Sequence, residues 1–368
     1  MASSQPLSFD RARADAFAAE LLATLNHGAL CLMISIGHRS GLYDAMATMA
    51  PSTSEEIAST AGLNERYVRE WLGAMVTGRI IEVAEANTAE SPGVRYSLPA
   101  EHAAYLTRAA TADNMAVFAQ YIPVLGNVEE HILECFRSGG GVPYSKFPRF
   151  HDVMAEESGQ SVMSALESHV VPLVAGLHER LSSGIRMLDV GCGRARIPVR
   201  LAELYPNSTF VGMDLSEEAT AHARANATAQ GLRNIEFIAR DLTDFDWTAE
   251  PDSFDFITTF DAVHDQARPL NVLRGIYRSL KPDGVYLMQD IKGSSHVQNN
   301  MDHPLGTVLY TISCLHCMTV SLAQGGEGLG AMWGEEKTRE YLAAAGFRSV
   351  EKRELAHDIQ NNWYIVHK

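Results

Sequence analysis

Residues 185–198 of this chain, Ile-Arg-Met-Leu-Asp-Val-Gly-Cys-Gly-Arg-Ala-Arg-Ile-Pro, constrain its fold more than any other stretch. The apolar run that ends at Val190 is too short for a helix and is bounded by glycine, which is typical of a buried strand. Gly191 and Gly193 permit a positive φ and let a ligand approach the main chain closely. A helix that starts after such a turn points its first N–H groups at the ligand. The stretch therefore predicts a strand, a tight turn and a helix around a bound ligand.

The spacing of small residues in this turn distinguishes two classes of cofactor. The dinucleotide fingerprint is Gly-x-Gly-x-x-Gly/Ala, because the third small residue lets the helix pack close to the strand. Arg196 occupies that third position here, and the small residue comes one place earlier, at Ala195. The resulting Asp-x-Gly-x-Gly-x-Ala pattern, which begins at Asp189, resembles the first motif of class I S-adenosylmethionine (SAM)-dependent methyltransferases. The resemblance implies SAM as the cofactor.

Short apolar strands alternate with helical stretches after the glycine turn. The strands expected from this pattern are 187–190, 209–213, 235–238, 254–260, 285–290, 347–350 and 363–366. Alternation of this kind is typical of a parallel sheet with helices on both faces. We therefore expect an α/β fold with a Rossmann-like class I methyltransferase sheet, preceded by a mostly helical N-terminal domain.

Polar residues follow each of the first four strands, where ligands of open parallel sheets bind. Asp214 ends the second strand and suits the two ribose hydroxyls, and Asp241 follows the third and suits the adenine amino group. Phe260 and Asp261 follow the fourth strand, where the methionine part of SAM would lie. The cofactor-binding residues expected on this basis are Asp189, Gly191, Gly193, Asp214, Leu215, Asp241, Leu242, Phe260 and Asp261.

The N-terminal part has the pattern of a winged helix-turn-helix. A long helix over 9–38 and a short one over 42–46 precede two capped helices, and strands over 79–83 and 94–98 follow, joined by a polar loop that contains residues 91–93. A DNA-binding role is the alternative to a structural or dimerisation role. Between Ser52 and Gly78 four glutamates stand against two arginines, whereas a recognition helix is normally basic. The charge favours the structural or dimerisation role.

The combination of this N-terminal domain with the core at 185–290 is similar to the plant-type small-molecule O-methyltransferases. The Lys281-Pro282-Asp283-Gly284 turn is a frequent feature of such cores. The Tyr-Val-Arg-Glu-Trp-Leu segment at 67–72 looks closest to a poorly characterised group of two-domain methyltransferases. The resemblance covers most of the chain and implies a homodimer that acts on a small molecule, but it does not identify the acceptor.

Three domains are expected along the chain. They are a winged-helix and dimerisation domain at 1–105, a helical linker and lid at 106–182, and the methyltransferase domain at 183–368. Residues 292–333 interrupt the alternation of helix and strand, so we expect an inserted cap. This cap and helices from 101–182 would form the acceptor pocket.

His264 and Asp290 are the expected catalytic residues. In the O-methyltransferases that this chain resembles, a His-Asp-Trp motif after the fourth strand supplies the general base; His264-Asp265-Gln266 keeps its first two residues and lacks the Trp. A histidine with a pKa near neutrality is suited to remove a hydroxyl proton, and Asp290 would orient its ring. The alternative is that His264 only packs beside the cofactor.

Two further clusters leave alternatives open. Cys314-Leu315-His316-Cys317 invites a metal interpretation, but structural zinc sites need four ligands, so we expect small buried hydrophobic residues and no metal. The minor alternative is a site whose cysteine thiols bind an arsenic-type acceptor. The aromatic residues Tyr144, Phe147 and Phe150 could favour the sulfonium of SAM by cation–π contact, or could pack between domains.

Composition limits the partners of the chain. A net charge of −15 disfavours nucleic acid and anionic membranes as partners, and we expect neither. No uninterrupted apolar stretch reaches the length of a membrane span, and five scattered cysteines fit a reducing compartment. We expect a cytoplasmic SAM-dependent methyltransferase; the alternative is a non-enzymatic SAM-binding regulator whose winged helix contacts DNA or protein.

Overall fold

The computed structural model describes residues 9–84 and 93–368 of the chain. Contacts between residues divide it into two compact units, one that ends at Ile122 and one that runs from Pro123 to Lys368. Residues 106–122 belong to the first unit, and residues 123–182 belong to the second.

The first unit is a winged helix preceded by a long helix. Its elements are α1 Arg11–Ser40, α2 Leu42–Met46, α3 Ser54–Ala61, α4 Glu65–Thr77, β1 Glu82–Ala84, β2 Arg95–Ser97, α5 Ala100–Leu106, and the 3-10 helices η1 Arg108–Asp113 and η2 Met115–Gln120. Thr53 and Glu56 form a capping box at the start of α3, which satisfies two N–H groups of the first turn. The wing strands β1 and β2 pair antiparallel, although the loop expected between them lies almost wholly outside the described residues.

Helix α1 has a row of exposed apolar side chains. Phe17 is 67% exposed and Leu25 66% exposed, and Leu21, Leu32 and Ile36 are exposed on the same side of the helix. By length and composition alone, two helical stretches could cross a membrane: α1, and residues 306–323 of the second unit. Neither stretch is uninterruptedly apolar, since polar residues such as Glu20, Asn26 and His27 lie within α1.

The helices that precede the sheet are short and irregular. They are α6 Tyr121–Gly126, α7 Glu129–Ser138, η3 Tyr144–Lys146, α8 Phe150–Ser158, the π-helical turns η4 Gly159–Met163 and η5 Leu166–Val170, η6 Val171–Leu173, and α9 Leu177–Ser183. Pro123 lies in the first turn of α6, where a missing N–H removes no helical hydrogen bond. Pro172 lies at the start of η6.

The second unit is built on a seven-stranded sheet with the order β5-β4-β3-β6-β7-β9-β8. Its strands are β3 Arg186–Val190, β4 Thr209–Asp214, β5 Ile235–Ala239, β6 Phe254–Phe260, β7 Leu280–Ile291, β8 Ser349–Arg353 and β9 Asn361–His367. The first five strands are parallel, and β9 is antiparallel to both of its neighbours. The strand order reverses at β3, so the switch point at which open α/β sheets bind ligands lies at the glycine turn.

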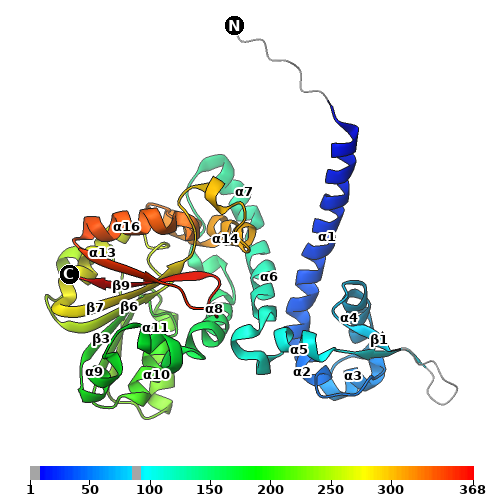
Figure 1. Cartoon of the computed structure of the whole chain (residues 1–368), viewed down its shortest axis with the longest axis horizontal. Coiled ribbons are helices and arrows are strands. Elements are labelled where there is room, and N and C mark those ends of the chain that lie inside the picture. The colour runs from blue at the N-terminus through cyan, green and yellow to red at the C-terminus, as the bar shows by residue number, and fades with distance from the viewer. Residues whose placement is uncertain (1–8, 85–92) are drawn as a thin grey trace, which may run out of the picture. The chain divides into compact units, whose positions relative to one another are not determined.

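Helices cover both faces of this sheet (Figure 1). The remaining helices before the insertion and after it are α10 Arg196–Leu204, α11 Glu217–Ala229, α12 Phe245–Thr248, α13 Pro269–Ser279 and α16 Gly334–Ala345. One buried cluster joins α13 and α16 to the sheet, and a second joins α9 and α10 to it. The α/β class and the Rossmann-like sheet expected from the sequence are confirmed.

The stretch at 292–333 is an insertion made of short helices between β7 and α16. Its elements are η7 Val297–Asn300, α14 Gly306–Ile312, the π-helical turn η8 Ser313–Cys317, α15 Met318–Ala323 and η9 Ala331–Trp333. The turn expected at 281–284 forms the irregular start of β7, where the register with β6 shifts.

Candidate active site

A cavity of about 700 Å³ opens at the carboxyl ends of β3, β4 and β6 in the second unit. The predicted cofactor residues in its wall are Asp189, Gly191, Gly193, Asp214, Leu215, Leu242, Phe260 and Asp261. Asp241 does not line the cavity: its side chain is exposed, and its Oδ1 accepts a hydrogen bond from the Thr243 N–H at 2.8 Å.

The glycine turn has the backbone that the sequence predicted. Gly191 has a φ of 73° and Gly193 a φ of 52°. A Cβ on Gly191 would lie 2.5 Å from the Cβ of Ala262, whereas a Cβ on Gly193 would meet nothing within 4 Å. Gly191 is therefore needed for close packing, and Gly193 leaves the main chain open to the cavity. Ala195 also has a positive φ, 54°, directly before α10.

Asp214 ties the end of β4 to the glycine turn. Its Oδ2 accepts from the Gly193 N–H at 2.7 Å, and its Oδ1 accepts from the Ser216 N–H at 2.8 Å. The carboxylate therefore fixes the loops on both sides of the cavity while it lines the wall itself.

Asp189 is the most deeply buried carboxyl group of the turn. Its Oδ1 accepts from the Thr258 hydroxyl at 2.7 Å. Burial raises the pKa of Asp189 to about 7, against the opposing effect of the Thr258 hydrogen bond. A cationic ligand in the cavity would favour its ionised form.

Asp261 lies in the cavity wall with an unmatched oxygen. Its φ of 47° is rare for a residue with a side chain. Its buried Oδ1 has no hydrogen-bond partner among the described residues. Burial, and then the charge of Asp290, raise the pKa of Asp261 well above its ordinary value. An unpaired, buried carboxyl oxygen at a cavity wall suits a cationic ligand group.

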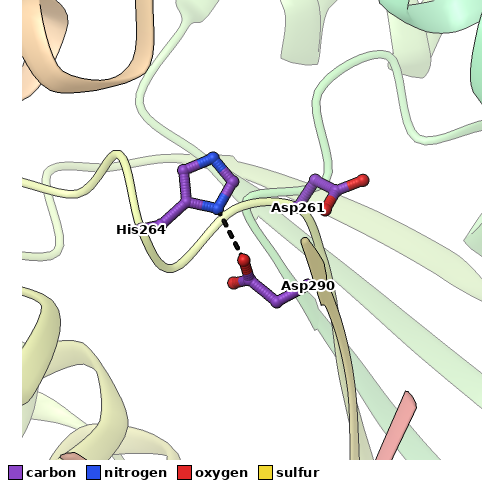
Figure 2. A group of neighbouring side chains, drawn as sticks. All are labelled: Asp261, His264 and Asp290. Atoms are coloured by element: carbon purple, nitrogen blue, oxygen red, sulfur yellow. Dashed lines mark hydrogen bonds and ion pairs between the residues drawn. The ribbon is translucent and has the colours of Figure 1, made fainter. Parts of the chain in front are cut away.

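His264 and Asp290 form the pair that the sequence predicted (Figure 2). His264 Nδ1 lies 2.8 Å from Asp290 Oδ1, which also accepts from the Trp333 indole N–H at 3.0 Å. His264 is 3% exposed and does not line the cavity. Burial by itself would lower the pKa of His264, but the charges of Asp290 and Cys317 and the hydrogen bonds to them together raise this pKa well above 6.5.

Asp261, His264 and Asp290 are also the candidate ligand set for a metal ion. One ligand atom from each lies within 4.8 Å of the others. His264 Nδ1 and Asp290 Oδ1 are hydrogen-bonded to each other, whereas Asp290 Oδ2 has no hydrogen-bond partner among the described residues. The arrangement is that of an oriented histidine.

An aromatic cluster forms one wall of the cavity. Tyr144, Phe147 and Phe150, all in the second unit, line it and surround His316 of the insertion. The His316 ring is stacked on Phe150 with centroids 3.4 Å apart, and meets Tyr144 edge-on at 5.0 Å. Burial, with the nearby His151 and His264, lowers the pKa of His316 well below 6.5. The part of 292–333 that lines the cavity is Gln324.

One polar pair in this wall was not predicted as a site. The Tyr144 hydroxyl donates to Asp265 Oδ2 at 2.7 Å, and both residues line the cavity. Asp265 stands next to His264 in the sequence, so its place near the site could have been predicted from the sequence. No spacing rule connects it to Tyr144, which is on a distant segment.

Arginines of the glycine turn hold α8 against the cavity. Arg194 pairs with Asp152 of α8 and, at 3.1 Å, with Glu218 of α11. Arg196 donates to the Ala155 carbonyl. The aromatic wall is therefore attached to the cofactor side by charged hydrogen bonds.

Comparison with known protein families gives two matches. Residues 28–108 match the model described as an Rv2258c-like winged HTH domain, and residues 181–346 match a methyltransferase domain. By domain content, the chain therefore joins a winged HTH domain to a methyltransferase domain.

Individual relatives and solved structures agree with this. A protein from Geobacillus sp. (strain WCH70), named as a methyltransferase, is 35% identical over 130 residues, which is 34% of this chain and 48% of that protein. The chain spans about half the length of the curated relatives it matches. The mitomycin 7-O-methyltransferase MmcR has a TM-score of 0.66 and 19% identity, with 97% of this chain and 100% of that chain covered. Human N-acetylserotonin methyltransferase in complex with SAM has a TM-score of 0.65 and 18% identity, with 99% of each chain covered. These structures share the two-part fold.

Proposed function

We propose that the protein is a SAM-dependent methyltransferase, and that SAM binds in the cavity of the second unit. The glycine turn carries this proposal, since Gly193 leaves the main chain open there and Asp214 ends the adjacent strand. The unpaired Oδ1 of Asp261 suits the α-ammonium group of the cofactor, and Asp214 suits the ribose hydroxyls. The bound cofactor supplies a methyl group on a positively charged sulfur.

The acceptor is a small molecule, held against the aromatic wall of Tyr144, Phe147 and Phe150. The chain's main contribution is alignment of the acceptor with the methyl group. A hydroxyl acceptor also needs a group that takes its proton. The sequence predicts His264 in this role; its ring is buried beside Asp290, while the wall itself offers Asp265.

Production of S-adenosylhomocysteine (SAH) tests this function. Purified protein is incubated with SAM and pools of small metabolites, and SAH and methylated products are measured by mass spectrometry. We expect SAH above the level of a protein-free control with at least one pool. Absence of SAM binding in calorimetry would contradict the proposal at its first step.

We also propose that the protein is a cytoplasmic homodimer. The exposed apolar row on α1 supports a second copy as its partner, because monomeric proteins rarely expose large contiguous apolar patches. All five cysteines are free, as a reducing compartment would leave them.

The charges of the winged helix favour a methyltransferase over a DNA-binding regulator. Both arginines of α4 pair with glutamates of the same helix, Arg66 with Glu70 and Arg69 with Glu65. Phosphate binding would have to break these pairs. The helix therefore has no free basic side chain within the described structure.

A further inference from the structure

The Tyr144–Asp265 pair is a polar feature of the cavity wall that the proposed cofactor contacts do not include. We propose that this pair, and not His264, takes the proton of a hydroxyl-bearing acceptor. The inference rests on the proposed function, because it assumes that a methyl acceptor enters this cavity. It assigns a catalytic role to two side chains that line the cavity.

The position of His264 argues against direct contact with an acceptor. Its Nδ1 is engaged with Asp290, and its second hydrogen-bonding partner is the buried thiol of Cys317. The ring is not in the cavity wall. Burial lowers the pKa of His264, but the charges of Asp290 and Cys317 and the hydrogen bonds to them together raise it, which favours the protonated imidazole. A protonated imidazole cannot remove a proton.

Asp265, unlike His264, lines the cavity and is suited to accept a proton. It is part of the wall, and burial raises its pKa above the ordinary value, although His264 and the Tyr144 hydroxyl act against this. A carboxylate with a raised pKa is a better proton acceptor. The charged and titratable groups that face it are His264, Tyr144, Asp214 and Asp290. Burial also raises the pKa of Tyr144, so its hydroxyl keeps its proton and donates it to Asp265.

Contacts on both sides of Tyr144 fix its position. The Val142 N–H donates to Thr319 Oγ1 at 2.8 Å. A Cβ on Gly141 would lie 2.0 Å from the Thr319 carbonyl oxygen, so the chain passes too close to α15 for any other residue. The Tyr144 ring then packs against His151 and His316. Removal of the hydroxyl alone should therefore leave the ring in place.

The proton transfer balances as follows. The acceptor O–H bond breaks and its proton goes to Oη of Tyr144, while the proton of Tyr144 passes to Oδ2 of Asp265. The acceptor oxygen forms its bond to the methyl carbon as the carbon–sulfur bond breaks, and that electron pair stays on sulfur. The sulfonium charge and the carboxylate charge are both lost, and Asp265 later releases its proton to water.

A binding experiment tests the pair without any turnover. The probes are 2-naphthol and its methyl ether, 2-methoxynaphthalene, and their affinities are measured by equilibrium dialysis with and without saturating SAH. We expect the wild-type protein to prefer the naphthol by about tenfold, a typical contribution of one hydrogen bond to a charged group. Tyr144→Phe and Asp265→Asn should remove the preference.

Two further variants serve as comparisons. His264→Asn should keep most of the preference for the naphthol. Tyr205→Phe is the matched control, because it removes a buried phenol hydroxyl that is bonded to His178 and does not line the cavity. It should behave as the wild type does.

The proton step is tested by methyl transfer to 2-naphthol, measured by mass spectrometry. Asp265→Asn and Tyr144→Phe should lower the rate about 10²–10⁴-fold, while calorimetry shows SAM affinity within about twofold of the wild type. His264→Asn should lose only a fewfold. The wild-type rate should rise with pH through the raised pKa of Asp265, and the Asp265→Asn rate should not.

Three results would overturn the inference. These are no naphthol preference in the wild type, a preference that survives Asp265→Asn, or a rate loss confined to His264→Asn. Failure of the wild type to bind SAM would instead refute the proposed function, and the dialysis without SAH would still report on the pair.

Discussion

At the scale of single residues, we expect Asp214 to have both a structural role and a role in cofactor binding. Its oxygens hold the Gly193 and Ser216 N–H groups, and the same carboxylate faces the cavity. Asp214→Asn keeps the size of the side chain and loses its charge. Since hydrogen bonds to charged groups contribute about 1.5–3 kcal/mol, calorimetry should show SAM affinity reduced at least about tenfold.

The control for Asp214 is Asp241→Ala. Asp241 was also expected to bind the cofactor, but its side chain is exposed and hydrogen-bonded to Thr243. We expect a change of less than about threefold in SAM affinity. A large loss for Asp241→Ala with no loss for Asp214→Asn would reverse this assignment.

Asp189 should make the stability of the cofactor-free protein depend on pH. Its pKa is about 7 in the folded state and near 3.8 in the unfolded chain. Below pH 4 both states are protonated and burial of the carboxyl costs nothing. Between pH 4 and 7 only the unfolded chain loses its proton, so stability falls as pH rises, and the full cost remains above pH 7.

Asp189→Asn should therefore stabilise the empty protein at pH 8 and leave it unchanged at pH 4. Its Oδ1 can still accept from Thr258. A gain of about 1 kcal/mol would raise Tm by about 2–4 °C for a unit of this size, which differential scanning fluorimetry resolves. An equal gain at both pH values would show that the cause is not the ionisation of Asp189.

The cofactor side of the site could be read from sequence, residue by residue, better than the acceptor side. Strand ends fix Asp214 and Asp261 in a parallel sheet, so their place follows from topology alone. The side-chain direction of Asp241 does not follow from it, because a local bond to Thr243 competes. The sequence also pairs His264 with Asp290, but says nothing about which side of the ring is buried. Tyr144 meets Asp265 only through the path of an irregular segment.

At the scale of elements, regular pieces were predictable and irregular ones were not. Strands with apolar runs, such as β3, β4 and β6, match the expected ranges within a residue or two. Within the expected helical part at 106–182, residues 150–183 form α8, two π-helical turns, the 3-10 helix η6 and α9. Apolar periodicity does not distinguish an α-helical turn from a π-helical one, since both depend on tertiary packing.

The exposed face of α1 leads to a prediction about assembly. Phe17→Glu with Leu25→Glu places charges on the apolar row, and His27→Glu places one on the opposite side of the helix. If the row meets a second copy, the wild type and His27→Glu should be dimers in light scattering, and the double variant should be a monomer.

Two outcomes would contradict this assembly. A wild-type monomer at micromolar concentration would leave the row without a second copy. Co-sedimentation of the wild type, but not of the double variant, with lipid vesicles would assign the row to a membrane, which the length and composition of α1 also permit.

At the scale of the whole molecule, the described residues that line the cavity all come from the second unit. Ligand binding should therefore stabilise that unit. SAH at about 100 times its dissociation constant contributes about 2.7 kcal/mol. In calorimetry, we expect the transition of the second unit to rise by several degrees, and that of the first to stay in place.

Asp214→Asn at the same SAH concentration is the control, and it should show a smaller rise. If both transitions of the wild type move together, the two units unfold as one. The division at Ile122 would then reflect the distribution of contacts, but not two separately unfolding units.

The two sides of the cavity are built from different kinds of segment. Its cofactor side comes from the ends of separate strands, whereas most of the opposite wall comes from one continuous stretch, 144–158. A change at a strand end disturbs the sheet, whereas a change within 144–158 alters a single segment outside the sheet. Acceptor preference can therefore diverge between related chains by replacement of that stretch, while the methyl donor stays the same. For the engineer, 144–158 is the part to exchange when a new acceptor is wanted.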